Sequence, residues 1–407
     1  MLVYNLLLLW IIISGIFLCE IHKDNHHIKL RITLFIVLSS IAMIILASLR
    51  GSTVGIDYPN YSGYFTEVYA GIHKQGATFL LSNANIYRPE LGYSFLNYVV
   101  ALFTNDVHIF MAVASIVVIG LTAVLVYKYS PIPWVSMFVF VSFGFFGNSL
   151  NFIRQCIAIA IFLFSIKYLK EKRFLPYIGI VVLAASFHKV MWIMIPLFFI
   201  ARIKVNWKSL TVYGGLTALI MGLSWPLFNL ITKYVYKYYA TKEGLYYMMG
   251  RDWQTAAIPV ITTVTLLIVK KFILQRDPKN VVLINFSIYS GLLYIMTCQH
   301  FLFQRFGMIF FTSAILIIPE LLASVGVNNE QVDVLRDTES LKIYKNKDQK
   351  KKALQERRQI KSSQNMRKYI YYYAAAAVLF IGFLYNVWIL MANRVNLIPY
   401  VTFFAKK

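Results

Sequence analysis

One arginine of this 407-residue chain lies about one helical turn inside an apolar segment. The stretch 147–151 contains two asparagines and a serine, Arg154 follows it, and an unbroken apolar run then covers 157–164. Removing a guanidinium from water costs several kcal/mol, so an arginine at such a depth usually faces a polar cavity or an anion. The alternative is that Arg154 snorkels from a helix end to the lipid headgroups.

Other ionisable residues are expected at the same membrane face as Arg154. The topology set out below rests on segment length and on Lys/Arg asymmetry, and it directs nine residues outward: Arg50, Asp57, Arg88, Glu90, Arg154, His188, Arg251, His300 and Arg305. Several guanidinium groups around one cavity form a site for a polyanion, and a diphosphate suits their two-pronged donors. A nearby carboxylate or histidine would serve as general base towards a hydroxyl. The pattern therefore predicts an enzyme site for a lipid-linked diphosphate.

The four loop residues of this set also have structural explanations. Arg50 and Arg88 fit residues that mark helix ends or interface depth. Asp57 fits a turn residue after Gly55, and Glu90, which follows a proline, fits the cap of a short helix.

The helix residues His188 and Arg305 favour a functional explanation, whereas Arg251 and His300 favour a structural one. His188 would otherwise be a neutral core imidazole, but its place in a broken helix favours function. Arg305 resembles Arg154 in lying a turn or so inside its helix, which also favours function. Arg251 and His300 are expected to be surface or structural residues.

No motif indicates a cofactor or a metal. The chain has no Walker A loop, HExxH, GxSxG, DxD or Cys-His metal spacing. Its three cysteines, Cys19, Cys156 and Cys298, are scattered in apolar segments and are expected to be small core residues. Transferase chemistry in this chain would therefore depend on arginine.

Composition indicates a polytopic, all-α membrane protein. The chain is 59% hydrophobic and 14% charged, with a mean hydropathy of +0.62, whereas soluble domains carry about 25% charged residues. The net charge of +23 lies mostly in short gaps between apolar segments, where Lys and Arg act as topology signals. No nucleic-acid partner is therefore expected.

About ten transmembrane helices are needed to position the ionisable residues. They are expected at about 2–18, 32–49, 107–126, 134–146, a fifth that carries Arg154, 210–231, 257–269, 281–297, a ninth that carries Arg305, and 369–390. The segment 50–105 is too polar to span the bilayer and is expected to fold outside, with a short helix at 91–103.

The segment 174–201 is expected to be a re-entrant hairpin. It is apolar except for 186–189 at its middle, and basic clusters flank both of its ends. Each half has about 13 residues, roughly 20 Å of helix, which is too short to cross the ~30 Å core. Two short helices with His188 at the outer tip satisfy both observations, whereas one long tilted helix would bury Lys189 near the membrane centre.

The chain is expected to divide into three parts. Residues 1–324 form a transmembrane catalytic domain, and 369–407 form the last transmembrane helix with an external tail. Between them, 325–368 holds twelve Lys/Arg and six Asp/Glu, and we expect a cytoplasmic loop or an amphipathic surface helix there.

These residues resemble the EpsG-like branch of the bacterial Wzy-type polysaccharide polymerases. The resemblance spans about 1–322 and is carried by Arg50-Gly51 with Gly55-Ile56-Asp57-Tyr58 and Tyr61; Arg88-Pro89-Glu90-Leu91-Gly92; Asn151-Phe152-Ile153-Arg154-Gln155 with Ala158; Phe187-His188; and the later Arg305. It implies a GT-C-like inner-membrane enzyme, facing the periplasm, that joins undecaprenyl-diphosphate-linked oligosaccharide repeats of O-antigen or capsule. Besides this substrate and the lipid bilayer, a chain-length regulator protein is a candidate partner. The long basic segment at 325–368 departs from the family.

The resemblance also assigns candidate roles. Arg154 and Arg305, with Arg50, would neutralise the leaving diphosphate, and a sugar hydroxyl would attack the anomeric carbon. His188 and Glu90 are both candidates for the base, with Asp57 as a further catalytic candidate. The remaining substrate-binding candidates are Arg88, Asn151, Gln155 and Tyr58.

Two other classes of function compete with this one. A flippase for lipid-linked oligosaccharides also carries intramembrane arginine, but it needs cavities that reach both faces, and transporters commonly show paired repeats. The sequence shows neither inverted repeats nor a matching inner polar cluster. A membrane acyltransferase that decorates surface sugars would use a histidine as well.

Overall fold

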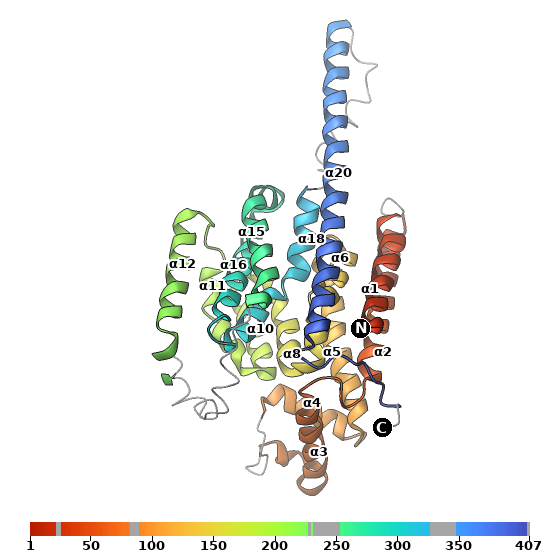
Figure 1. Ribbon diagram of the computed structural model, residues 1–407, viewed down its shortest axis with the longest axis vertical. Helices are drawn as coiled ribbons and strands as arrows, with labels where there is room; N and C mark the ends of the chain where they lie inside the picture. Colours follow the sequence, from red (N-terminus) through yellow and green to blue (C-terminus); the bar gives the residue numbers. More distant parts are fainter. Residues whose placement is uncertain (22–25, 82–88, 227–228, 231–252, 326–346, 405–407) are drawn as a thin grey trace.

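The computed structural model describes residues 1–21, 26–81, 89–226, 229–230, 253–325 and 347–404. Over these ranges the regular structure is helical, and the one isolated β-bridge joins Arg50 to Thr402. The helices run roughly side by side, and a smaller helical layer covers one end of the bundle (Figure 1). The protein is therefore all-α, as the composition predicts.

Among the residues that the structure describes, six helices are long and apolar enough to cross a membrane. The spans are Leu2–Glu20 (α1, Leu2–Gly15, continued by the π-helical η1, Ile16–Glu20), α2 (Ile28–Leu49), α5 (Val107–Tyr129), α15 (Trp253–Arg276), Pro278–Met296 (η5, Pro278–Asn280, with α16, Val281–Met296) and the Asn365–Ala392 part of α20 (Lys347–Ala392).

Two further pairs of described helices are apolar enough to span but are bent, as in a broken span or a re-entrant loop. The pair α6 (Pro133–Ser142) and α7 (Phe145–Asn151) bends by 54°, and the pair α17 (Leu302–Phe311) and α18 (Ala314–Val325) bends by 42°. At the first bend Gly144 has φ +80°, which glycine adopts without steric cost. Counting each pair as one span gives eight candidate spans, against the ten or so expected.

The other expected spans are interrupted or shorter. The helix that carries Arg154 divides at Phe164 into α8 (Ile153–Leu163) and α9 (Ser165–Glu171). The helix expected at 210–231 corresponds to α12 (Trp207–Gly222), and part of the expected range lies outside the described residues.

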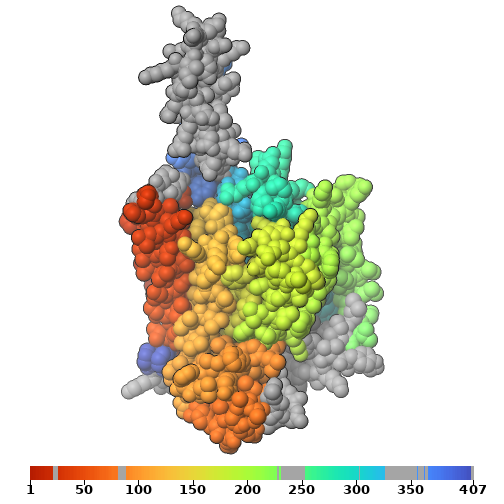
Figure 2. All heavy atoms as spheres, turned by 180° about the vertical axis from the view of Figure 1, so that it is seen from behind, coloured from red at the N-terminus to blue at the C-terminus, as the bar shows by residue number. Residues whose placement is uncertain are grey.

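The segment 50–105 forms the layer that covers one end of the bundle. It contains α3 (Tyr58–Gln75), the 3-10 helix η2 (Gly76–Leu81) and α4 (Leu91–Ala101), so the short helix expected at 91–103 is confirmed. Figure 2 shows this layer in orange, directly below the yellow-green helices of the bundle. We call this end of the molecule the α3–α4 end.

The break expected at His188 is present. The helix α10 (Phe174–Phe187) ends there in extended backbone, and η3 (Lys189–Met194) and α11 (Leu197–Ile200) follow. The Tyr177 hydroxyl donates a hydrogen bond to the Met194 carbonyl, and the rings of Phe174 and Phe198 lie 5.0 Å apart. The chain therefore returns along α10, so that both ends of the segment lie away from the α3–α4 end.

The helix α20 is continuous over 46 residues, about 70 Å at 1.5 Å per residue. The helix includes 347–368, so this half of the segment expected as a loop or an amphipathic helix is helical. The other half, 326–346, lies outside the described residues. The polar portion projects beyond the other helices, on the side opposite the α3–α4 layer (Figure 1).

The hairpin predicts opposite accessibility for two lysines. In a cysteine-free background, Lys189→Cys lies exposed at the tip, and Lys204→Cys lies exposed beyond the other end of the segment. We expect an impermeant maleimide to label position 189 in intact spheroplasts and position 204 only in inverted vesicles. A position 189 that is unreactive in both preparations would instead indicate one long helix.

Candidate functional site

Glu90 stands immediately before α4 in extended backbone, with φ −62° and ψ 146°. Its carbonyl accepts the helix-starting hydrogen bond from the Ser94 N–H at 2.9 Å. Its side chain makes no capping hydrogen bond to α4. Glu90 therefore occupies the N-cap position considered for it, but its carboxylate does not cap α4 and is directed towards other elements.

The Glu90 carboxylate joins α8 and the broken hairpin. Its Oε2 accepts a hydrogen bond from Arg154 NH1 at 2.8 Å, and its Oε1 accepts one from the Lys189 backbone N–H at 3.0 Å. The His188 Nδ1 lies 3.4 Å from the same Oε1, which is an ion-pair contact when the imidazole is protonated. Only 11% of the Glu90 side chain and 14% of the His188 side chain are exposed, so these charges meet largely away from water.

The surroundings of Glu90 keep it ionised. Burial acts to raise its pKa, but the His188 imidazole, the Lys189 N–H and the charge of Arg154 outweigh burial and lower the pKa to about 2. At neutral pH the carboxylate is therefore an anion that neutralises Arg154 and is a weak base.

The guanidinium of Arg154 has several partners within the protein. Besides Glu90, its guanidinium lies 5.8 Å from the ring centre of Tyr93. A contact with the Tyr61 hydroxyl adds a further partner. The sequence analysis did not include Tyr93 in the site, although it lies three residues after Glu90 and so on the same face of α4.

His188 has both ring nitrogens buried. Neither makes a hydrogen bond of good geometry within the described part of the chain. The nearest charged group is the Glu90 carboxylate, whose Oε1 lies 3.4 Å from Nδ1.

Asp57 and Arg305 lie beside this cluster. Burial raises the pKa of Asp57, and the charges of Arg305 and Arg154 act against that rise. The Arg305 carbonyl accepts a hydrogen bond from the Gln155 side chain at 2.6 Å, which fixes α17 against α8. Across the ranges that the structure describes, no hydrogen bond or ion pair engages the Arg305 guanidinium, so its donors are available to an anion.

Three other candidates serve the scaffold. Arg50 is 1% exposed, donates to the Leu150 carbonyl at 2.6 Å and lies against the Tyr58 ring. The Tyr58 hydroxyl is 3.2 Å from His108 Nδ1. Asn151 accepts a hydrogen bond from the Ile56 N–H at 2.7 Å. As placed, the Arg50 guanidinium has no access to a ligand.

The remaining candidates lie apart from the cluster. Arg88 and Arg251 lie outside the described residues. His300 is buried and packs edge-on against Trp225 at 5.3 Å.

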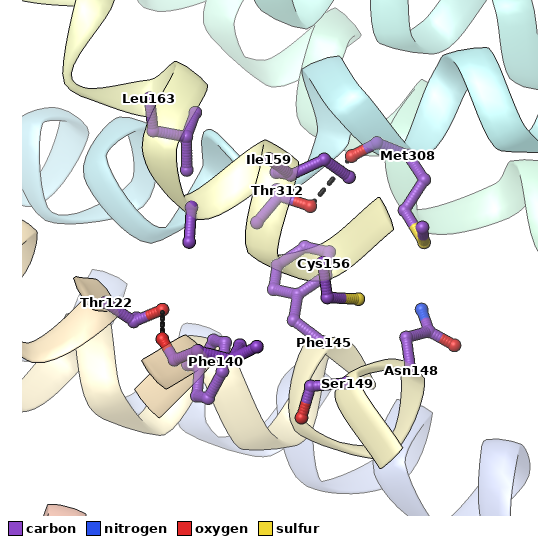
Figure 3. A pocket seen from close by; sticks show the side chains of 12 residues that line it. Thr122, Phe140, Phe145, Asn148, Ser149, Cys156, Ile159, Leu163, Met308 and Thr312 are labelled. Atoms are coloured by element: carbon purple, nitrogen blue, oxygen red, sulfur yellow. Dashed lines mark hydrogen bonds between the residues drawn. The ribbon is translucent and has the colours of Figure 1, made fainter. Parts of the chain in front are cut away.

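Two cavities lie between the helices that follow and precede the cluster in the chain, and no cluster residue lines either of them. Figure 3 shows the first, in which Cys156 of α8 and Asn148 of α7 face the same space. Its volume is about 20 Å³, enough for about one water molecule but not for a sugar. A second cavity of about 80 Å³ is lined by Asn148, by Gln304 next to Arg305, and by Arg394. This cavity lies between α7, α17 and the end of α20, and Arg305 itself does not line it.

Apolar spans with an ionised cluster at one end define a multi-pass membrane protein. The model of the EpsG family matches residues 33–332, about three quarters of the chain. The chain therefore belongs to the EpsG family.

One curated relative supports the same assignment. The amylovoran biosynthesis protein AmsC of Erwinia amylovora is 28% identical over 179 residues, which cover 43% of this chain and 47% of AmsC. The match thus spans about half the length of that relative. No solved structure gives a significant match, and the GT-C-like fold stays a prediction.

The contact between α4 and α10 depends on a glycine. A Cβ at Gly92 would lie 2.5 Å from Ser186 Oγ and 2.9 Å from the Ser186 carbonyl oxygen. We expect Gly92→Ala to lower the free energy of unfolding by roughly 1–3 kcal/mol, measured by thermal unfolding in detergent. Gly179→Ala in α10 is the matched control, because nothing lies within 4 Å of that Cβ. Equal stability of the two variants would contradict close packing at Gly92.

The low pKa of Glu90 predicts a pH-dependent contribution to stability. Because the folded-state pKa lies below the ordinary 4.5, the contribution is fully present above pH 4.5 and is lost as the pH falls towards 2. We expect Glu90→Gln to cost roughly 2–3 kcal/mol at pH 7.

The difference in the free energy of unfolding between wild type and Glu90→Gln should become smaller at pH 3, as measured by thermal unfolding. Glu171→Gln is the control, because that partly exposed carboxylate contacts Arg173 at 3.6 Å near the other end of the molecule. A difference that stays constant from pH 7 to pH 3 would exclude the ionised Glu90 as its source.

Proposed function

We propose that this protein polymerises oligosaccharide repeats carried on undecaprenyl diphosphate into a surface polysaccharide. Membership of the EpsG family supports a role in polysaccharide assembly, as does the name of AmsC, a biosynthesis protein for amylovoran. The observation that carries the proposal is the buried Glu90 carboxylate, which bridges Arg154 and the broken helix at His188. That cluster combines a base with anion-binding groups at one end of a membrane bundle.

In this proposal His188 is the general base. Glu90 is unsuited to the role because it stays ionised and bound to Arg154. It can instead accept a hydrogen bond from protonated Nδ1 of His188, which leaves Nε2 as the proton acceptor. A sugar hydroxyl of one repeat then attacks the anomeric carbon of another, and His188 takes the hydroxyl proton. The bond from the anomeric carbon to the diphosphate oxygen breaks, and its electron pair leaves with the diphosphate.

The leaving diphosphate is assigned to Arg305 first and Arg154 second. Arg305 has uncommitted donors among the described residues, whereas Arg154 already gives NH1 to Glu90. A diphosphate between the two would gain charge neutralisation at the moment the bond breaks. Asp57 is a second candidate for proton transfer, because the charges of both arginines act to lower its pKa.

The site is proposed to face the periplasm from the inner membrane. The lysines and arginines of 167–173 and 202–208 lie towards the opposite end, since Arg202 donates to the Leu169 carbonyl at 3.0 Å. Such basic segments mark the cytoplasmic face.

Purified protein in nanodiscs, supplied only with the synthetic lipid-diphosphate repeat, should produce a ladder of polymer lengths. We expect His188→Gln to lower the rate by about 10²–10⁴-fold through loss of the base. Arg305→Lys and Arg154→Lys keep the charge but lose the planar pair of donors, and each should cost about 10²-fold or more.

Two matched substitutions serve as controls. His73→Gln on the exposed face of α3 and Arg173→Lys near the opposite end should leave the ladder unchanged. A full ladder from Arg154→Lys at equal abundance would make Arg154 an anchor. Transfer of intact repeats between leaflets with no new glycosidic bond would replace the proposal with a flippase, and a product that forms only with an added acyl donor would replace it with an acyltransferase.

A further inference from the structure

A pocket of about 190 Å³ opens at the end of the molecule opposite the Glu90 cluster. The chain runs from Arg154 through α8 and α9 to Glu171, about 25 Å of helix, before it reaches this pocket. The pocket is lined by residues of α5, α8, α9, η5, α16 and α18. Three lysines, Lys167, Lys170 and Lys279, contribute to its lining.

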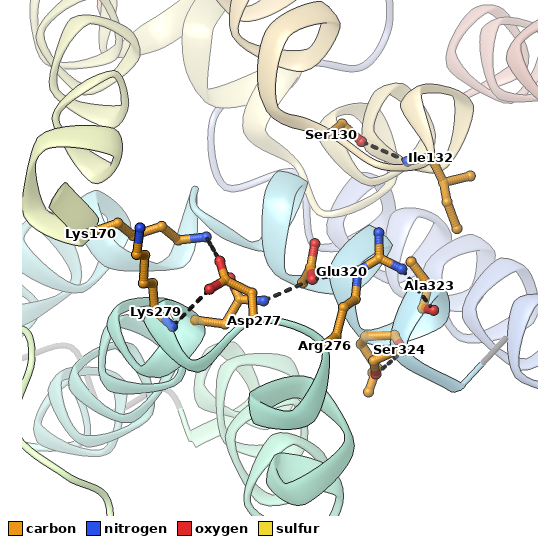
Figure 4. A network of polar contacts seen from close by, with 11 residues as sticks. Ser130, Ile132, Lys170, Arg276, Asp277, Lys279, Glu320, Ala323 and Ser324 are labelled. Carbon is orange, nitrogen blue, oxygen red and sulfur yellow. Dashed lines mark hydrogen bonds and ion pairs between the residues drawn. The ribbon is translucent and has the colours of Figure 1, made fainter. Parts of the chain in front are cut away.

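The acidic groups at this pocket are already engaged by other partners, as Figure 4 shows for Glu320 and Asp277. Glu320 lies 2.9 Å from Arg276 Nε and accepts a hydrogen bond from the Asn280 side chain at 2.8 Å. Asp277 lies 3.6 Å from the Lys170 ammonium. The third carboxylate, of Glu171, lies 3.6 Å from Arg173.

Two ammonium groups are left without a carboxylate. Within the described ranges, Lys167 and Lys279 form no ion pair, and both side chains are exposed. Lys170, by contrast, is held by Asp277 and by the Asn280 side chain. The pocket therefore carries an uncompensated positive charge, which favours an anion.

Part of the pocket wall is apolar. Leu163 and Ile166 contribute from the α8–α9 side, and Leu283 and Leu316 from α16 and α18. Tyr129 also lines the pocket, and tyrosine is typical of the depth at which membrane proteins meet the headgroup region. A free phosphate would satisfy the lysines but leave this apolar wall in contact with water.

We propose that this pocket binds an anionic phospholipid of the leaflet at that end. The lipid phosphate would lie between Lys167 and Lys279, and the first carbons of its chains would cover the apolar wall. Basic pockets between transmembrane helices recognise anionic headgroups in this way. The site is separate from the polymerisation chemistry and does not depend on it.

Native mass spectrometry of the detergent-purified protein, with phosphatidylglycerol and phosphatidylcholine added in equal amounts, tests the proposal. We expect wild type to retain phosphatidylglycerol preferentially. In the double variant Lys167→Gln/Lys279→Gln, the ratio of bound phosphatidylglycerol to bound phosphatidylcholine should fall by about tenfold. Each single substitution should lower this ratio by about threefold. The single variants provide the result if the double variant is not monodisperse.

The double variant Lys128→Gln/Lys271→Gln is the matched control. It removes two exposed lysines that do not line the pocket, and it should keep the preference of wild type. Equal loss in both double variants would overturn the pocket in favour of unspecific surface charge. Displacement of the lipid by equimolar glycerol 3-phosphate would overturn the lipid assignment in favour of a soluble phosphate, and a wild type without preference would overturn both.

Discussion

The buried carboxylate of Glu90 sets a requirement that several other features of the structure meet. A buried anion must be paired and hydrogen-bonded. Arg154 supplies the charge, and the break at His188 frees the Lys189 N–H as a donor. Gly92 lets α4 approach Ser186 closely, two residues from His188, which brings Glu90 near both partners. The helix break, the glycine and the intramembrane arginine are thus parts of one arrangement.

Interrupted helices recur around this cluster. The bend at Gly144 ends α6, and α8 begins only at Ile153, so Arg154 lies in a first helical turn. Irregular backbone at membrane depth needs protein partners. Asn151 binds the Ile56 N–H, and Gln155 binds the Arg305 carbonyl. These two amides hold the scaffold, while Arg305 keeps its guanidinium available.

The hairpin at 174–201 could be predicted from the sequence because its length and flanking charges are both physical constraints on a span. The helix at 91–103 could be predicted for a similar reason, since that segment is too short to cross the membrane. The contact partners of single side chains could not be predicted. The sequence separates Arg50, at a helix end, from Arg305, inside its helix, but it does not show that Arg50 is buried and bonded to the Leu150 carbonyl, because burial is decided by tertiary packing. The direction of the Glu90 side chain, away from α4, depends on the same long-range contacts.

The helix α20 continues without a break from its polar portion into its membrane span. Its polar portion, 347–364, extends about 27 Å before the membrane span begins at Asn365. The span then seats tightly on the bent pair, with Gly382 against Phe138 and Ile389 against Gly144. Because the backbone hydrogen bonds run without a break along this helix, a tilt of 347–364 would also move the span that packs against the bend from which α7 leads to Arg154.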